Sequence, residues 1–309
     1  MGKFVTLAEQ PHPHRHLELV SGSISQQAKA EFVEGWMLKR VQHDDVSGLK
    51  VESQAEPCFA PNTQLANARH LTELPHMNYA LPIILIAFLL IAALERVSPA
   101  RVAARGRWPI NIGLGALNLL LVRLASVAGP FAITAFAASY DFGLFNQLTL
   151  PPALTAILVI VLMDFAIYWQ HRASHRFGWF WALHKLHHAD TDFDITTGLR
   201  FHPGEALLSM LYKGAVGALL GAPPEAMLLF ELYIAVGSMI EHANIALPPR
   251  IERVVRRVWV TPAMHTVHHS AHGDDHNHNY CFAISIWDRL FGTYRARSGG
   301  TMIGLPQAG

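Results

Sequence analysis

Long apolar stretches after Tyr79 constrain the fold of this chain more than any other feature. The clearest is 152–169 (PALTAILVIVLMDFAIYW), in which Asp164 is the only charged side chain. About 20 such residues cross the roughly 30 Å of hydrocarbon in a bilayer. The backbone must bond to itself there, so such stretches form helices. Because only 15% of all residues are charged, the sequence predicts an all-α, integral membrane helical bundle.

Further apolar segments bring the expected number to about four to five. They are 79–94, then 110–128 with a broken extension to 139, then 206–220 and 223–240. Gly221-Ala222-Pro223-Pro224 separates the last two, and this turn composition predicts a short hairpin.

The two ends of the chain differ from this apolar part. Residues 1–76 are polar and mixed, without helical or strand periodicity, which is typical of a disordered tail; an upstream start-codon miscall is the alternative. The expected membrane domain covers 77–300, and residues 301–309 are expected to form a flexible C-terminal tail.

Arginine placement predicts the orientation of the bundle. Arg96, Arg101, Arg105 and Arg107 follow the first apolar segment, and such basic loops stay in the cytoplasm. The basic segment 172–185 lies two expected crossings later, hence on the same side. If segment 206–240 enters the membrane and returns to the same side, every histidine cluster lies on the cytoplasmic side.

Composition excludes several classes of function. A net charge of +1 without a basic stripe argues against nucleic acid. The two cysteines, Cys58 and Cys281, are too few and too far apart for a thiol-based metal site. Histidine is different, because 13 of the 19 histidines lie between His171 and His278.

These histidines form three boxes: HRASH (171–175), HKLHH (184–188) and HTVHH (265–269). Side chains three or four positions apart share one helical face, so each box can direct imidazoles at one ion. Eight imidazoles exceed the four that one zinc ion needs, which favours two metal ions. His202 and His242, at the two ends of the expected hairpin, can each complete a ligand shell. His272, His276 and His278 fall in a polar loop and are expected to be exposed.

With these boxes, RFHPGE (200–205), EHANI (241–245), NY (279–280) and WDRLFGTY (287–294), residues 80–295 resemble the fatty acid hydroxylase superfamily, also called the sterol desaturase family. The resemblance implies a membrane-embedded bundle with a cytosolic, histidine-rich cap that binds two irons. One departure is Cys281, where the family usually has Gly. The implied metal ligands are His171, His175, His184, His187, His188, His202, His242, His265, His268 and His269.

Asp164 lies seven positions before His171 and eleven before His175, on nearly the same face of one expected helix. A charge inside an apolar span is costly, so Asp164 is expected to face the protein interior. Two interpretations are open: a hydrogen-bonded helix-packing residue, or an acceptor that orients a ligand imidazole.

The resemblance implies an O2-dependent non-haem di-iron enzyme that hydroxylates or desaturates an unactivated C–H bond of a lipid: a sterol, fatty acyl chain, sphingolipid, alkylglycerol or carotenoid. The sequence contains no dinucleotide fingerprint and no cysteine cluster for iron–sulfur, so electrons are expected from a separate ferredoxin, cytochrome or reductase. One alternative is a membrane metal-binding or metal-transport protein, although transport sites lie at mid-membrane. A zinc hydrolase is a second alternative, but HExxH is absent.

The expected domain boundary near Met77 can be tested by truncation. Deleting residues 1–76 should leave membrane insertion and metal content intact, because no box and no apolar segment is removed. Membrane fractionation and metal analysis of the truncated chain measure both properties, and loss of both would contradict the boundary.

Overall fold

Helices are the regular elements of the part of the chain that the structure describes. This computed structural model describes residues 77–102, 105–125 and 129–305, so the expected tail 1–76 lies outside it. Within these ranges the chain forms helices, short 3-10 turns and isolated β-bridges. The all-α prediction is therefore confirmed. The helices are α2 (Met77–Val97), α3 (Trp108–Leu124), α4 (Pro130–Ala138), α5 (Pro152–Arg176), α6 (Gly178–His188), α7 (Pro203–Leu220), α8 (Pro224–His242), α9 (Pro249–Val255), α10 (Pro262–His268) and α11 (Ile286–Leu290).

Two of the described helices are long and apolar enough to cross a membrane, over Tyr79–Val97 and Pro152–Arg176. The first is longer than the predicted 79–94, because the helix continues through Glu95 and Arg96. Large apolar side chains on α2 are exposed rather than packed, for example Leu89 at 66% and Leu90 at 61%. A water-soluble surface rarely carries such a patch, so these helices indicate an integral membrane protein.

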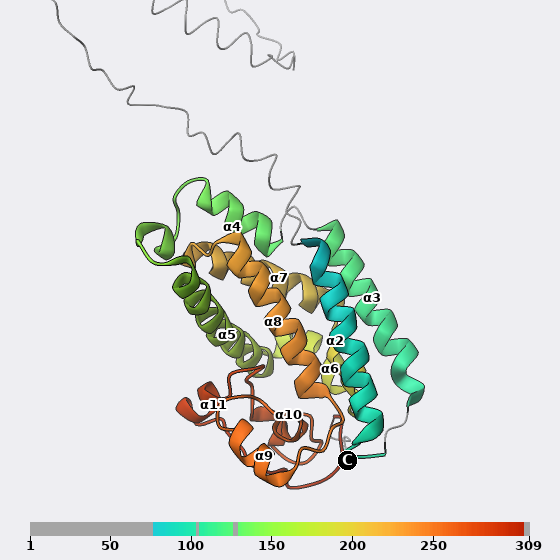
Figure 1. Ribbon diagram of the computed structural model, residues 1–309. Coiled ribbons are helices and arrows are strands. Elements are labelled where there is room, and N and C mark those ends of the chain that lie inside the picture. The colour runs from blue at the N-terminus through green and yellow to red at the C-terminus, as the bar shows by residue number, and fades with distance from the viewer. Residues whose placement is uncertain (1–76, 103–104, 126–128, 306–309) are drawn as a thin grey trace, which may run out of the picture. The chain divides into compact units, whose positions relative to one another are not determined.

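The remaining apolar segments form a bundle around α7 and α8. Helix α2 packs on α8, α3 and α4 pack on α7, and α5 contacts both (Figure 1). The region 110–139 is divided as expected, with Gly129 as the N-cap and Pro130 as the first residue of α4.

The predicted turn between α7 and α8 is present at Gly221. Gly221 ends α7 in the left-handed conformation, with φ of +65°, which only glycine adopts without strain. A Cβ there would lie 2.9 Å from the Gly143 carbonyl carbon. This turn therefore needs glycine for two reasons, its backbone conformation and the close approach of the segment before α5.

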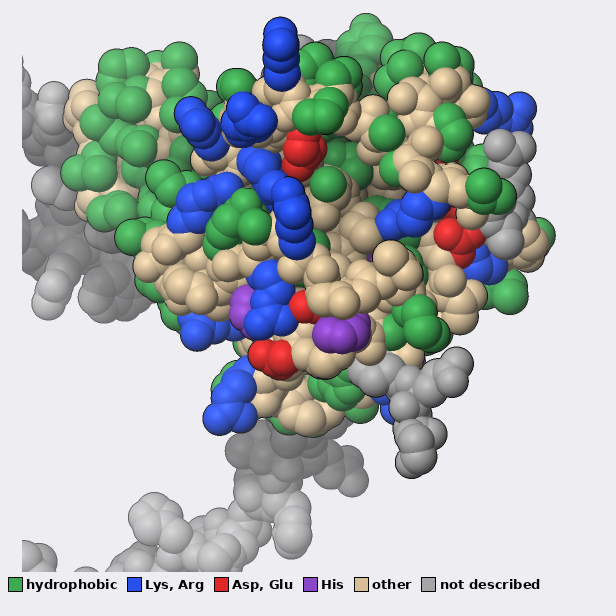
Figure 2. All heavy atoms as spheres, turned by 90° about the horizontal axis from the view of Figure 1, so that it is seen from below, with side chains coloured by type: hydrophobic (Ala, Val, Ile, Leu, Met, Phe, Trp, Pro, Cys, Tyr) green, Lys and Arg blue, Asp and Glu red, His purple; other side chains and the backbone are tan. Residues whose placement is uncertain are grey.

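Residues 244–305, called the C-terminal cap here, close one end of the bundle. They contain α9, α10 and α11, which lie beyond the ends of α5 and α8 (Figure 1). Figure 2 shows the outer face of this end, where Lys and Arg side chains gather and little histidine is visible. The chain stays attached beyond residue 300, because the Gly304 amide donates a hydrogen bond to the His269 carbonyl, at 3.0 Å.

Candidate metal centre

Nine histidines converge between the bundle and the C-terminal cap. Helix α5 runs without a break from its apolar part into HRASH, so one rigid element carries both ligands of that box. Helix α6 carries HKLHH, α8 ends at His242, and α10 with the residue after it carries HTVHH. The histidines form two groups, and within each the candidate ligand atoms lie within 4.8 Å of one another. The first group is His171, His175, His184, His188 and His268; the second is His187, His242, His265 and His269.

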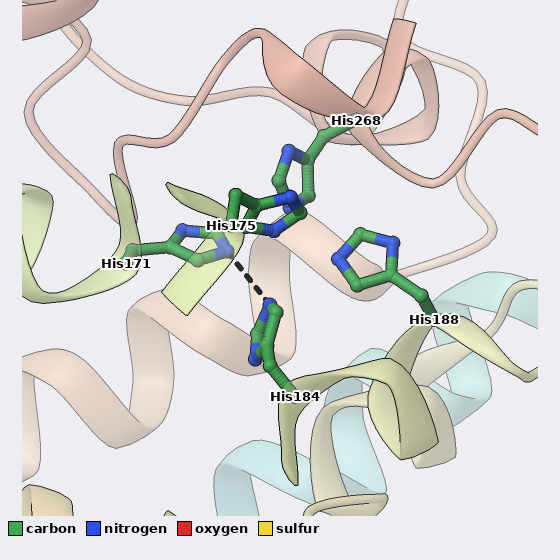
Figure 3. A group of neighbouring side chains, drawn as sticks. All are labelled: His171, His175, His184, His188 and His268. Atoms are coloured by element: carbon green, nitrogen blue, oxygen red, sulfur yellow. Dashed lines mark hydrogen bonds between the residues drawn. The ribbon is translucent and has the colours of Figure 1, made fainter. Parts of the chain in front are cut away.

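Each HxxHH box contributes to both groups. In HKLHH, His184 and His188 point to the first group and His187 to the second. In HTVHH, His268 belongs to the first group, whereas His265 and His269 belong to the second. Figure 3 shows the first group, with imidazoles from α5, α6 and α10 directed at a common space. The HxxHH spacing therefore allows each of the two short helices, α6 and α10, to contribute histidines to both groups.

The tautomers leave facing lone pairs in the first group. His171 Nδ1 donates to the Tyr280 carbonyl at 2.8 Å, and His184 Nδ1 donates to Glu205 Oε1 at 2.6 Å. Both Nε2 atoms therefore carry a lone pair when the rings are neutral, yet these two atoms lie only 3.2 Å apart. A cation between them would turn this repulsion into coordination.

In the second group, hydrogen bonds among the described residues fix the tautomer of His242. His242 Nδ1 donates to the Ser238 carbonyl at 2.7 Å, so its Nε2 carries a lone pair. That atom lies 3.2 Å from His187 Nε2 and 3.0 Å from His265 Nε2.

Many ring nitrogens in both groups are buried without a hydrogen-bond partner among the described residues. Both nitrogens of His175, His188 and His269 are in this position. Buried polar atoms normally have partners, and metal coordination would provide them. The donor set, neutral imidazole, suits iron, copper and zinc. The residues present therefore fit two metal ions.

Burial keeps these imidazoles neutral. Loss of hydration holds the pKa of His187, His188, His265, His268 and His269 well below its ordinary value. Protons therefore compete little with a metal for these nitrogens at neutral pH.

His202 is the one predicted ligand that lies outside both groups. Its Nδ1 accepts a hydrogen bond from the Gly204 amide at 3.0 Å and so caps the start of α7. In the polar loop, His272 is exposed, with 58% of its side chain accessible. His276 is half-buried instead, because its ring lies 5.8 Å from Trp181 and 6.1 Å from His175.

Asp164 packs helices together rather than contacting an imidazole. Its Oδ1 accepts from the Tyr233 hydroxyl at 2.9 Å, and its Oδ2 accepts from Trp287 Nε1 at 2.7 Å. These bonds connect α5 to α8 and to α11. The structure therefore favours the first of the two interpretations, the packing residue.

The segment around Cys281 does not need glycine. Cys281 is not among the residues with positive φ; Asn279 is, at +56°, and asparagine tolerates that conformation. Asp288 of the WDRLFGTY motif accepts from the Tyr280 amide at 2.8 Å and from the Cys281 amide at 3.1 Å. This motif therefore fixes the backbone whose carbonyl holds His171.

Sequence reasoning assigned no role to two buried carboxylates beside the histidines, Glu205 and Glu241. Glu205 is bonded to His184, as described above, and Glu241 Oε2 lies 3.5 Å from His265 Nδ1. Both stand inside quoted motifs, RFHPGE and EHANI, which was the available signal.

A cavity of about 1290 Å³ extends from the first group into the bundle. His171 and His184 line its metal end, and its walls come from α3, α4, α5, α7 and α8. Side chains such as Phe131, Met210 and Leu228 make much of this lining apolar. The cavity can therefore bring an apolar molecule to the first histidine group.

A membrane-associated, histidine-rich metal centre is the class of site that this geometry defines. Residues 156–293 match the family model described as fatty acid hydroxylase. This part, which is less than half of the chain, is similar to that family.

Several proteins similar to this chain are named as lipid hydroxylases, monooxygenases or desaturases. The chain is 30% identical to an ornithine lipid hydroxylase of Rhizobium tropici (50% of this chain, 46% of the relative). It is 28% identical to an alkylglycerol monooxygenase of Danio rerio (56% and 38%). A Delta(7)-sterol 5(6)-desaturase of Aspergillus fumigatus is 29% identical (61% and 54%). The chain thus matches only about half or less of each relative's length. No solved structure matches it.

The role of Asp164 can be tested by replacement with Leu. The change leaves two donors, Tyr233 Oη and Trp287 Nε1, without their acceptor, at a cost of about 1–3 kcal/mol each. Asp164→Leu should therefore lower the unfolding temperature in detergent, measured by circular dichroism, while Asp164→Asn should lower it less. If Asp164 instead oriented an imidazole, metal affinity would fall without loss of thermal stability.

Proposed function

We propose that this chain is an integral membrane di-iron oxygenase that uses O2 and external electrons to hydroxylate or desaturate an unactivated C–H bond of a lipid. The single observation that carries the proposal is the pair of buried histidine groups at the end of an apolar cavity. The fatty acid hydroxylase match and the lipid-modifying relatives support the lipid as substrate.

The histidines would hold one iron in each group. Iron supplies the O2 activation that no side chain can perform. The protein supplies position, because α5, α6, α8 and α10 fix the imidazoles, and dryness, because the groups are buried. A lipid chain would lie in the cavity, with its reactive carbon beside His171 and His184. A separate electron donor, a ferredoxin, cytochrome or reductase, completes the proposal.

A different function, membrane metal binding or transport without oxygenase activity, uses the same histidines. The cavity separates the two, since a carrier of hydrated ions gains nothing from a largely apolar chamber beside its ligands. We therefore favour the oxygenase, and O2 consumption coupled to lipid oxidation distinguishes the two functions.

We also propose that the metal centre lies on the cytoplasmic side. The arginine-rich loop after α2 contacts the start of the C-terminal cap: the Arg101 amide donates to Asn244 Oδ1 at 3.0 Å, and the Ala246 amide donates to the Ser98 carbonyl at 3.1 Å. Two segments in contact share one side of a membrane.

Cysteine labelling tests this orientation. Single cysteines placed at Val102 and Asp274, both exposed, should not react with an impermeant thiol reagent added to intact cells. They should react once the membrane is permeabilised, because the reagent then reaches the cytoplasmic side. The control is the Cys58→Ser protein without an added cysteine. It keeps Cys281, which is buried and should not be labelled. Labelling of the two positions from opposite sides would refute the shared side, and labelling of both from outside would refute the cytoplasmic assignment.

Metal content and activity test the oxygenase itself. Purified protein should contain about two irons per chain and consume O2 as it oxidises lipid. His171→Ala, His187→Ala and His268→Ala should each abolish activity while the protein still inserts, because a missing donor leaves a poorly held ion among the remaining ligands. Lipid products are measured by mass spectrometry, and metal by elemental analysis.

Two further variants sharpen the ligand set. His272→Ala, at an exposed histidine outside both groups, is the matched control and should behave like the parent. His202→Ala tests the predicted ligand that the groups leave out; retained iron would restrict its role to the cap of α7, worth about 1 kcal/mol. An active protein with stoichiometric zinc and turnover without O2 would overturn the proposed function.

A further inference from the structure

Two buried glutamates stand beside the histidine groups, one beside each. Glu205, on the first turn of α7, accepts from His184 Nδ1 at 2.6 Å. Glu241, near the end of α8, lies with Oε2 3.5 Å from His265 Nδ1 and Oε1 3.7 Å from His242 Nδ1. His184 belongs to the first group, and His265 and His242 belong to the second.

Glu241 is the less satisfied of the two. Its side chain is fully buried, and neither oxygen has a hydrogen-bond partner among the described residues. His265 Nδ1 is likewise buried without a partner. His242 cannot help, because its Nδ1–H is already used by the Ser238 carbonyl. Among the described residues, the free donor beside Glu241 is therefore His265 Nδ1.

Leaving a carboxylate buried and unpaired is costly unless an opposite charge lies nearby. Each histidine group supplies only neutral donors, so a divalent ion would bring an uncompensated double positive charge into a buried space. Metal-bound imidazoles commonly donate their second N–H to a carboxylate, which orients the ring and strengthens it as a donor. One carboxylate beside each group would provide both the negative charge that balances the ion and the acceptor for the second N–H of a ligand imidazole.

We propose that Glu205 and Glu241 are a matched pair of positioning residues: Glu205 orients His184 on the first metal, and Glu241 orients His265 on the second. The proposal rests on the two-metal centre of the proposed function. The contact of Glu205 is already at hydrogen-bond length. The contact of Glu241 would shorten from 3.5 Å to the usual range of about 2.7–3.2 Å as His265 turns toward its metal.

Metal binding by glutamine variants tests the pair. Glutamine keeps the shape of the side chain and removes the charge. Full-length apoprotein in detergent is titrated anaerobically with Fe(II), and binding is followed by calorimetry and elemental analysis. Glu205→Gln and Glu241→Gln should each keep one metal at parent affinity and bind the other about 10- to 100-fold more weakly. Circular dichroism confirms that each variant is folded.

Backgrounds with one disabled group assign each glutamate to its metal. His269→Ala disables only the second group, and His175→Ala only the first. In the His269→Ala protein, Glu205→Gln should weaken the remaining metal and Glu241→Gln should not. The His175→Ala protein should show the opposite. Glu231→Gln is the matched control on α8, because Glu231 pairs with Lys213 at 2.6 Å and touches no imidazole; its metal affinities should equal those of the parent.

The outcomes separate this proposal from the proposed function. A parent protein that binds fewer than two metals would contradict the two-metal centre itself. If the parent binds two metals and Glu241→Gln binds both at unchanged affinity, only the pairing of glutamates with metals is overturned. The pairing is also overturned if either glutamine variant weakens both metals equally. Should Glu241→Gln fail to fold, Glu241→Asp replaces it: the shorter carboxylate should weaken the second metal alone, and parent affinity for both metals would contradict the pairing.

Discussion

The architecture depends on bringing lone pairs of neutral imidazoles together inside a protein. In the first group two Nε2 atoms that cannot donate lie 3.2 Å apart, and in the second His242 Nε2 faces two others at 3.0 and 3.2 Å. In the first group this arrangement is repulsive without a cation, and the surrounding burial removes the water that would weaken the repulsion. The helices, the cap and the hydrogen bonds at the Nδ1 atoms hold the rings in this arrangement. A bound cation would turn the repulsion in the first group into coordination.

Helix continuity is what makes the arrangement possible. Because α5 carries its apolar part and HRASH on one rod, the position of the membrane part fixes the position of two ligands. Helix α10 approaches from the C-terminal cap, and its Thr261 N-cap and the Asp288 contacts order the backbone within the cap. Asp164 adds a direct connection between the bundle and α11. Disturbing the cap should therefore disturb the metal centre even where no ligand is touched.

Much of the site was predictable because its histidines lie close together in the sequence. The three boxes and His242 supply all nine grouped histidines, and i, i+3, i+4 spacing places side chains on one helical face without knowledge of the fold. The division of each HxxHH box between two groups was not predictable, since it depends on how α6 and α10 face each other. His202 shows the same limit: its position beside the hairpin allowed a ligand role, but its side chain caps the helix that it precedes. The choice between the two interpretations of Asp164 likewise depended on partners more than sixty residues away, Tyr233 and Trp287.

The two histidine groups are not equivalent toward the cavity. His171 and His184, both of the first group, line it, whereas no histidine of the second group does. The second group lies instead against Phe201, stacked on His187 at 4.4 Å, and against Phe193, whose ring is 5.1 Å from that of His269. Under the proposed function, a lipid carbon would meet the first metal, and Phe201, which lines the cavity and stacks on His187, would separate the lipid from the second. Substrate specificity would then be set by the residues that surround the first group, from α3, α4, α5, α7 and α8, rather than by the histidine boxes that identify the family.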